Sequence, residues 1–198
     1  HFTRASMWEA LDVSGSAGQV LAGYGDGRLL LTPLDGGPTK TLDLGTPMVS
    51  GGVPVAASVS WGTFFPGGGF AASTGRSNIP WGSDVAASRP TMAHPGENTL
   101  WVYGTDGELA WNWQAEPAIQ GLSVSPDGRR LLVGGGPRGS DLRRDLFGAF
   151  VLRLDGDGSG QERIEASCGT DAPVFFGHAL TNDGRAAVSE VPFKDETG

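Results

Sequence analysis

Oxygen-bearing side chains recur at alternate positions in one short glycine-rich segment, and this spacing could bind a metal ion. Asp155, Asp157 and Ser159 are separated by single glycines. Such oxygens converge on a hard cation such as calcium, and glycine permits the bend between them. The twelfth position of a calcium loop counted from Asp155 falls on Ala166, which offers no side-chain oxygen. The segment therefore predicts either a calcium site or a flexible hairpin turn, and no other cofactor is indicated.

Residues that serve as acids, bases or nucleophiles are scarce. The chain has three histidines, of which His178 lies in an apolar run typical of a strand, where a structural role is expected. His1 could chelate copper if it is a mature N-terminus. Cys168 is the single cysteine, so neither a disulfide nor a paired-cysteine metal site is expected within this span. The sequence predicts no catalytic residues.

Two turn-rich stretches are candidates for contact with a partner. The longer one, residues 73–97, is flanked by Trp61 and contains Trp81 between a proline and a glycine. Loops longer than about 12–15 residues are usually functional or disordered. The shorter stretch, 137–146, carries Arg143 and Arg144 beside acidic residues. We expect these four side chains to contact a partner.

Composition limits the class of protein. The chain has 33 glycines and 13 prolines in 198 residues, nearly twice the roughly 12% of average usage. These turn residues alternate with short apolar runs, a pattern typical of a many-stranded β protein. The net charge of −8 argues against a nucleic-acid surface. No apolar run approaches the roughly 18 residues of a membrane span.

Repeated hairpins are the clearest signal of architecture. Strands are expected at 119–124 and 129–134 around Asp127-Gly128, and the pattern returns around Asp183-Gly184. Asp-Gly between apolar runs is a strong hairpin signal. Asp106-Gly107 and Asp155-Gly156 mark a second kind of hairpin that lies between these copies. We expect each pair of tips to be equivalent.

Alternating hairpins of this kind predict four-stranded antiparallel blades, which make up an all-β propeller. The expected blades span residues 6–47, 51–115 and 118–166, with half a blade at 172–191. About three and a half blades cannot close a ring, because the smallest propellers have about four. We therefore expect this chain to be part of a longer protein or to be completed by a partner.

Two segments resemble known repeat families. Ser125–Gly135 is similar to the strand-turn-strand of WD40, TolB-type and YVTN-type propellers. Gly107–Trp113 is similar to the end of a blade in PQQ-like and arylsulfotransferase-like propellers, where a tryptophan packs between blades. The resemblance implies a propeller fold and leaves the activity open.

Three functions are compatible with these observations. The first is a non-catalytic interaction scaffold whose partners are protein subunits or further blades of the same chain. The second is an exported enzyme, or its subunit, similar to quinoprotein dehydrogenases or arylsulfotransferases, with its site in the central channel. The third is an extracellular sugar-binding or adhesive propeller. The scaffold agrees best with the lack of a catalytic set, and the last two functions favour an exported location.

Overall fold

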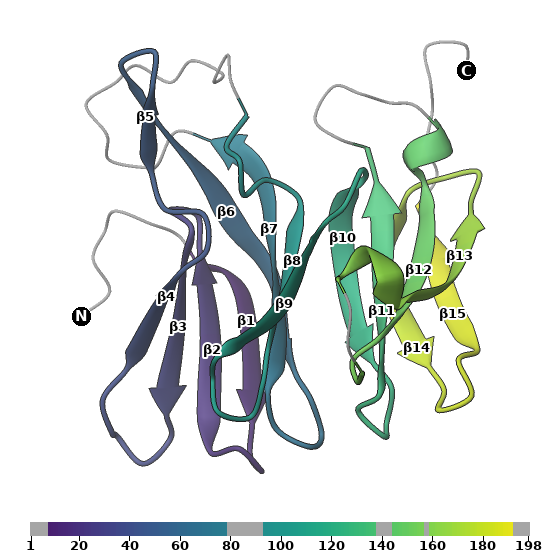
Figure 1. Ribbon diagram of the computed structural model, residues 1–198, viewed down its shortest axis with the longest axis horizontal. Helices are drawn as coiled ribbons and strands as arrows, with labels where there is room; N and C mark the ends of the chain where they lie inside the picture. The colour runs from purple at the N-terminus through teal and green to yellow at the C-terminus, as the bar shows by residue number, and fades with distance from the viewer. Residues whose placement is uncertain (1–7, 79–92, 138–143, 157–158, 192–198) are drawn as a thin grey trace.

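The computed structural model describes residues 8–78, 93–137, 144–156 and 159–191. In these ranges the regular structure is antiparallel strand, with two single-turn 3-10 segments, η1 (Arg144–Leu146) and η2 (Gln161–Arg163), and no α-helix. The strands form four successive sheets, which stand side by side in Figure 1. All-β propeller architecture is thus confirmed.

Each sheet follows the chain, so that every strand pairs with the next one in sequence. Sheet 1 contains β1 (Trp8–Ser14), β2 (Gln19–Tyr24), β3 (Arg28–Pro33) and β4 (Lys40–Asp43). Sheet 2 contains β5 (Met48–Ser50), β6 (Val53–Phe64), β7 (Phe70–Asn78), β8 (Thr99–Tyr103) and β9 (Leu109–Gln114). Sheet 3 contains β10 (Ala118–Val124), β11 (Arg130–Gly136), β12 (Gly148–Arg153) and β13 (Ile164–Gly169). Sheet 4 contains β14 (Val174–Leu180) and β15 (Ala186–Glu190).

The Asp-Gly tips occupy the positions expected from the sequence. Gly128 and Gly184 close the β10–β11 and β14–β15 hairpins with φ of +70° and +84°. Positive φ favours glycine, because a side chain would clash with the backbone there. Asp106-Gly107 and Asp155-Gly156 lie in the connections β8–β9 and β12–β13, which are the outer hairpins of sheets 2 and 3. Both expected equivalences are therefore confirmed.

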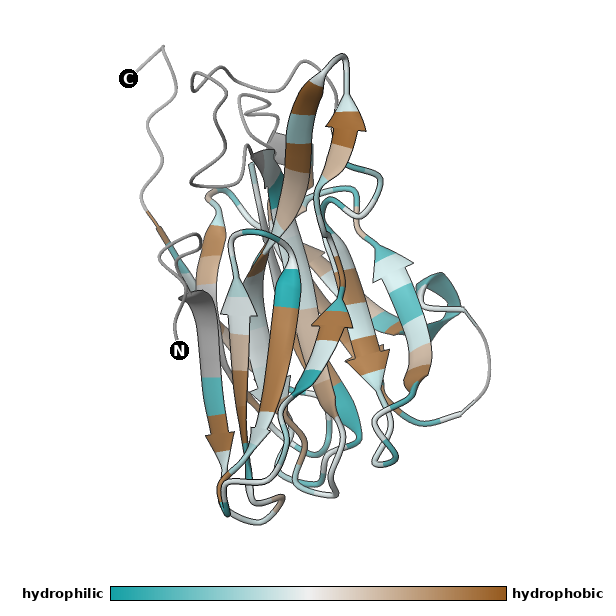
Figure 2. Cartoon of the chain, turned by 90° about the vertical axis from the view of Figure 1, so that its left-hand side faces the viewer, coloured by the Kyte–Doolittle hydropathy of each residue, from teal (hydrophilic) through white to brown (hydrophobic). Residues whose placement is uncertain are grey.

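Sheet 2 departs from the expected four strands because it contains an additional strand. β5 pairs with the beginning of β6 through a two-glycine turn, Gly51-Gly52, with φ of +59° and +82°. Three residues between Pro47 and Gly51 are too short to stand out as a strand in the sequence. The side chains of Met48 and Val49 are 41% and 74% exposed. The β5–β6 hairpin projects beyond its neighbours and shows apolar bands in Figure 2.

Apolar layers between the sheets form the core. Leu21, Leu29 and Leu31 of sheet 1 pack against a sheet 2 group that includes Val59 and Phe70. A second cluster joins sheets 2 and 3 and contains Leu100, Trp111, Trp113, Leu131, Val133 and Leu152. The first full-length strands of successive sheets also contact one another, β1 with β6, β6 with β10, and β10 with β14. This arrangement places the starting strands together on the inner side and the hairpins β3–β4, β8–β9 and β12–β13 on the outside.

Candidate interaction surface

Sheet 4 presents the most incomplete surface in the described part of the chain. It has two strands, whereas the other sheets have four or five. One face of β14 is covered, because Leu180 packs with Leu132, Ala149 and Val151 of sheet 3. Every residue of β15 is exposed. The free edge of β15 consequently offers backbone groups for pairing with another strand.

The outer strand of sheet 3 is exposed where the equivalent strand of sheet 2 is buried. In β9, Trp111 and Trp113 are 7% and 6% exposed, because the outer hairpin of sheet 3 covers them. The indole Nε1 of Trp113 donates a hydrogen bond to Gln161 Oε1 at 2.9 Å. In β13, by contrast, residues Glu165 to Gly169 are all exposed. The difference arises because, among the described residues, sheet 4 has two strands and no outer hairpin that could cover β13.

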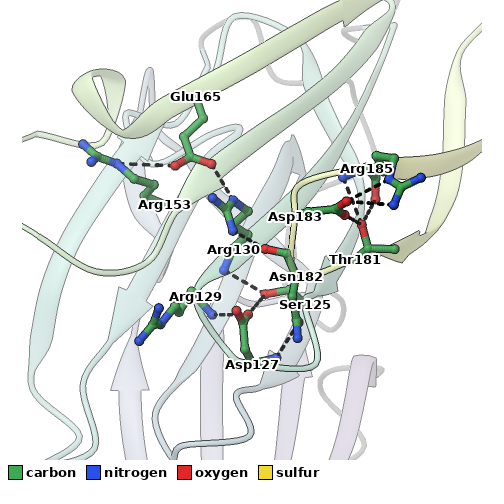
Figure 3. A network of polar contacts seen from close by, with 10 residues as sticks. All are labelled: Ser125, Asp127, Arg129, Arg130, Arg153, Glu165, Thr181, Asn182, Asp183 and Arg185. Carbon is green, nitrogen blue, oxygen red and sulfur yellow. Dashed lines mark hydrogen bonds and ion pairs between the residues drawn. The ribbon is translucent and has the colours of Figure 1, made fainter.

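A polar network fixes the β14–β15 hairpin against sheet 3 (Figure 3). The Asp127 backbone N–H donates to Asn182 Oδ1 at 3.0 Å, and the Arg130 guanidinium donates to the Asn182 carbonyl. Arg130 Nε also donates to Glu165 Oε2 at 2.6 Å. These contacts join hairpins from two sheets. The free edge of β15 is therefore held in a defined position.

Hydrogen bonds at the two hairpin tips shift the pKa values of Asp127 and Asp183, and a hydrogen bond to Glu165 shifts that of Arg130. The Ser125 hydroxyl donates to Asp127 and lowers the pKa of this carboxyl. Arg185, followed by the Thr181 hydroxyl, lowers the pKa of Asp183. The hydrogen bond to Glu165 raises the pKa of Arg130. These shifts keep both carboxylates and the guanidinium charged near neutral pH, so the network holds the two hairpins through charged hydrogen bonds.

A polar cluster fixes both ends of the segment that contains Trp81. The Glu97 side chain accepts hydrogen bonds from the backbone N–H and hydroxyl of Ser77, at 3.2 and 2.7 Å. The His94 backbone N–H donates to the same Ser77 hydroxyl, and His94 Nε2 lies 3.1 Å from the carbonyl oxygen of Thr46. Asn98 is fully buried and adopts φ of +51°, while its amide donates to Glu97. The two ends of this segment are thus held together on sheet 2.

Of the four predicted partner residues, the structure describes Trp61 and Arg144. Trp61 lies within β6 and packs against the core between sheets 2 and 3. Arg144 begins η1, whereas Arg143 and Trp81 lie outside the described residues. His178 lies on β14, as a strand residue. Contact of these four side chains with a partner stays a prediction.

The guanidinium of Arg163 lies beside the predicted calcium segment. Arg163 donates to the carbonyl oxygens of Leu154, Asp155 and Gly156, with 2.8 Å to Asp155, and lies 5.0 Å from the centre of the Trp111 ring. The backbone N–H of Ser159 donates to Glu162 and lowers the pKa of that carboxyl. Asp157 lies outside the described residues. Calcium binding by Asp155, Asp157 and Ser159 stays a prediction.

Three features of this region have little or no signal in the sequence. Arg163 was not recognised, because a lone arginine before a strand gives no signal of burial. Ala166 and Cys168 carry small side chains that face sheet 4, since they pair with Val151 and Ala149 in the register. They form an open surface because β13 pairs with β12 in this register and because sheet 4 has two strands in the described residues. Asn182 had a weak signal, as part of the Asn-Asp-Gly tip.

The described ranges contain neither a cluster of metal ligands nor a membrane-spanning helix. No group of three or more His, Cys, Asp or Glu side chains gathers there in a way that could hold a metal ion. Within the same ranges, no helix has the length and hydropathy needed to cross a membrane.

Comparison with known proteins supports the fold and no closer relationship. No family model matches the sequence, and no curated protein matches it significantly. The computationally designed Ika4 protein is 15% identical with a TM-score of 0.54, over 96% of this chain and 95% of its own. Raptor from Chaetomium thermophilum is 11% identical with a TM-score of 0.52, over 89% of this chain and 14% of its own. The β-propeller domain of Cps50 (Swd1) from Myceliophteria thermophila is 12% identical with a TM-score of 0.49, over 89% of this chain.

The chain spans 46% of the Swd1 domain and a smaller part of Raptor. Identities this low show the fold alone. The class of protein defined here is a β-propeller, represented by three complete sheets and part of a fourth.

Proposed function

We propose that this chain is a non-catalytic β-propeller module that acts as a protein–protein interaction scaffold in a larger assembly. The open fourth sheet is the observation that carries the proposal, because an exposed strand edge beside a partly uncovered sheet face is stabilised by contact with more protein. We assign the repeats to the WD40-like kind, on the Ser125–Gly128 tip. The partners are other subunits or further blades.

Sheet 1, at the other end of the row from sheet 4, supports the same proposal. Leu21 and Leu31 point from sheet 1 into the core, so the intervening positions face away from sheet 2. Val20 and Leu30, on that outward face, are partly exposed, and Val13, which pairs with Val20, is 56% exposed. Sheet 1 and sheet 4 thus both leave apolar surface uncovered. This favours a module that is completed by other protein.

The groove between sheets 1 and 2 supports a role without catalysis. Its volume is about 360 Å³, and its walls are mostly apolar residues and glycines, with Lys40 and Asp106 as the charged groups among its lining residues. Lys40 donates to the Gly107 carbonyl at 3.0 Å and lies 3.6 Å from Glu108. A lysine held in this way braces two sheets. The segment Gly107–Trp113, which favoured the enzyme alternative, contributes two tryptophans to the core.

Isolation of the assembly tests this function. A tagged chain purified from its own cells should elute as a stable complex, well above the mass of 20.5 kDa. Trp81→Ala should weaken that complex by about tenfold or more, as for tryptophans at the centres of interfaces, without lowering the melting temperature. Leu109→Ala, at an exposed apolar residue of β9, is the matched control and should change neither property. A chain that elutes alone under all conditions would contradict the scaffold.

A further inference from the structure

The groove between sheets 1 and 2 is a pocket whose walls are complete within the described residues. The walls come from the β1–β2, β3–β4, β6–β7 and β8–β9 connections, which lie together at the lower end of Figure 1. Sheet 1 has four strands and sheet 2 has five, so the pocket does not depend on the unfinished fourth sheet. Its volume of about 360 Å³ lies at the lower end of the roughly 300–1,000 Å³ of small-ligand sites. The pocket is therefore large enough for a compact ligand.

The floor of this pocket is apolar and partly aromatic. Leu31, Phe64 and Phe70 line it and are 5%, 8% and 2% exposed, because they belong to the core between the two sheets. The rings of Phe64 and Phe70 meet edge to face, with centroids 6.1 Å apart. Pro33 and Pro38 add further apolar surface. A phenyl ring placed here would extend the aromatic contacts that the core already contains.

Glycines keep the pocket open on the side of sheet 2. Five of the lining residues are glycines: Gly67, Gly68, Gly69, Gly104 and Gly107. Gly68 and Gly69 have φ of +88° and +78°, so the β6–β7 turn favours glycine at both positions. A Cβ at Gly67 would meet nothing within 4 Å. Backbone without side chains allows a ligand to approach closely.

The two charged residues of the pocket differ in what they already bind. Lys40 Nζ donates to the Gly107 carbonyl at 3.0 Å and lies 3.6 Å from Glu108, so the protein itself supplies partners for this ammonium. Asp106 Oδ1 accepts the backbone N–H of Glu108 at 3.0 Å, and within the described residues Asp106 forms no ion pair. A carboxylate can accept further hydrogen bonds. The pocket consequently favours a cation over an anion.

We propose that this pocket binds an apolar primary amine, whose phenyl-sized group lies over Leu31, Phe64 and Phe70 and whose ammonium donates to Asp106. The same chemistry occurs in a free amine and at the N-terminus of a peptide that begins with an aromatic residue. An anionic ligand is disfavoured, because Asp106 and Glu108 repel it. This inference goes beyond the scaffold function, since the site needs no further protein to form.

Selective [15N]glycine labelling measures binding at this pocket directly. Three probes share a phenylpropyl chain and end in an ammonium, a hydroxyl or a carboxylate: 3-phenylpropylamine, 3-phenylpropanol and 4-phenylbutyrate. At pH 6.5 and low salt, the amine should shift the amide signals of the five pocket glycines and leave those of Gly128 and Gly184, at the tips of sheets 3 and 4, unchanged. Its Kd should be about fivefold below that of the alcohol, as for an exposed charge pair, and the carboxylate should bind more weakly than the alcohol.

An isosteric pair of variants tests the role of the carboxylate. Asp106→Asn keeps an acceptor for the Glu108 N–H and removes the charge, so the amine and the alcohol should bind this variant equally. Asp35→Asn is the matched control, because Asp35 Oδ1 accepts the Gly37 N–H at 3.0 Å in the β3–β4 turn and does not line the pocket. This control should retain the preference for the amine. Both carboxylates are exposed, so both variants should melt like the parent chain.

A peptide identifies the source of the amine. Phe-Gly-Gly-amide presents a phenyl ring and an ammonium at the start of a chain, and its α-amino group is protonated at pH 6.5. Binding about tenfold tighter than that of 3-phenylpropylamine would assign the site to a protein N-terminus. Equal or weaker binding would assign it to a free amine.

Three results would overturn the inference. The first is that the amine shifts none of the five pocket glycines, or shifts Gly128 and Gly184 equally. The second is equal affinity of the parent chain for the amine, the alcohol and the carboxylate, a comparison that needs no variant. The third is a preference for the amine that persists in Asp106→Asn. None of these results bears on the scaffold, which is tested separately by isolating the assembly.

Discussion

Arg163 illustrates how one buried cation stabilises an outer hairpin of this fold. Its side chain is 5% exposed, donates to backbone carbonyls at 154–156 and lies over Trp111 of the adjacent sheet. A buried guanidinium needs such partners, because leaving water is costly for a charge. The residue therefore joins the β12–β13 connection to β9.

Replacing Arg163 by methionine should lower the free energy of unfolding by about 2–3 kcal/mol, because the carbonyls lose charged donors and the indole loses its cation. Urea denaturation measures the change. Arg153→Gln is the matched control, since its Nε lies 3.8 Å from Glu165 and its side chain is 49% exposed. A loss equal to that of the control would contradict the role of Arg163.

The calcium hypothesis is tested at the same loop. Because Arg163 already supplies a cation to carbonyls of this loop, we expect the same melting temperature in calcium and in excess chelator. Asp157→Ala should likewise leave the melting temperature unchanged in both buffers. A melting temperature that falls on chelation in the parent chain and not in the variant would instead establish calcium binding.

Tyr103 should titrate far above an ordinary phenol. Burial, with a smaller contribution from Glu108, raises its pKa to about 12. Its ring stacks on Phe70 with centroids 4.7 Å apart. Absorbance at 295 nm should contain a step with a midpoint near this value, and Tyr103→Phe should remove it.

The Tyr103 phenol ionises at a lower pH in the unfolded chain than in the folded chain. The contribution of this tyrosine to stability should therefore be lost as pH rises from about 10 to 12. A Tyr103 step near pH 10 would contradict its burial.

At the scale of elements, the β12–β13 connection lies close against β9 of sheet 2, and this close approach depends on Gly160. A Cβ there would lie 2.4 Å from Cβ of Trp113, at a φ of −56° that other residues adopt easily. Gly160→Ala should therefore cost about 1–3 kcal/mol through steric overlap. Gly169→Ala, where the nearest atom would be 4.0 Å away, should change stability by less than about 0.5 kcal/mol. Equal melting curves for both variants would contradict the packing of the β12–β13 connection on β9.

Hairpins were predictable because their signals are local. The Asp-Gly tips at 127–128 and 183–184 combine a turn acid with a glycine at positive φ, and apolar runs flank them. β5 was missed, since a strand of three residues is defined by its pairing with β6 and not by its own pattern. That the last sheet is incomplete was predictable from the half blade at 172–191, but the residues of the open surface were not, because the exposure of Ala166 and Cys168 depends on strand pairing.

At the scale of the whole molecule, the protein is a row of similar sheets, each of which buries the face of its neighbour. The incompleteness of the ring was predictable by counting repeats. The residues that line the open surface were not predictable, because long insertions and tryptophans draw attention to loops such as 73–97. Trp61, chosen for that reason, lies within β6 and packs, partly buried, against the core between sheets 2 and 3. The uncovered surface on β13 can be recognised only from the strand pairing within sheet 3 and the strand number of sheet 4.

Hydrogen–deuterium exchange on the isolated chain and on the assembly purified from its own cells tests the scaffold most directly. In the isolated chain, peptides covering β13 and β15 should exchange quickly, because β15 has one pairing partner and β13 is an exposed edge. Peptides covering β2 and β11 should exchange slowly in both samples, because these strands pair on both sides. We predict strong protection of β13 and β15 in the assembly. Equal exchange of these two strands in both samples would contradict the account that sheet 4 is completed by a partner.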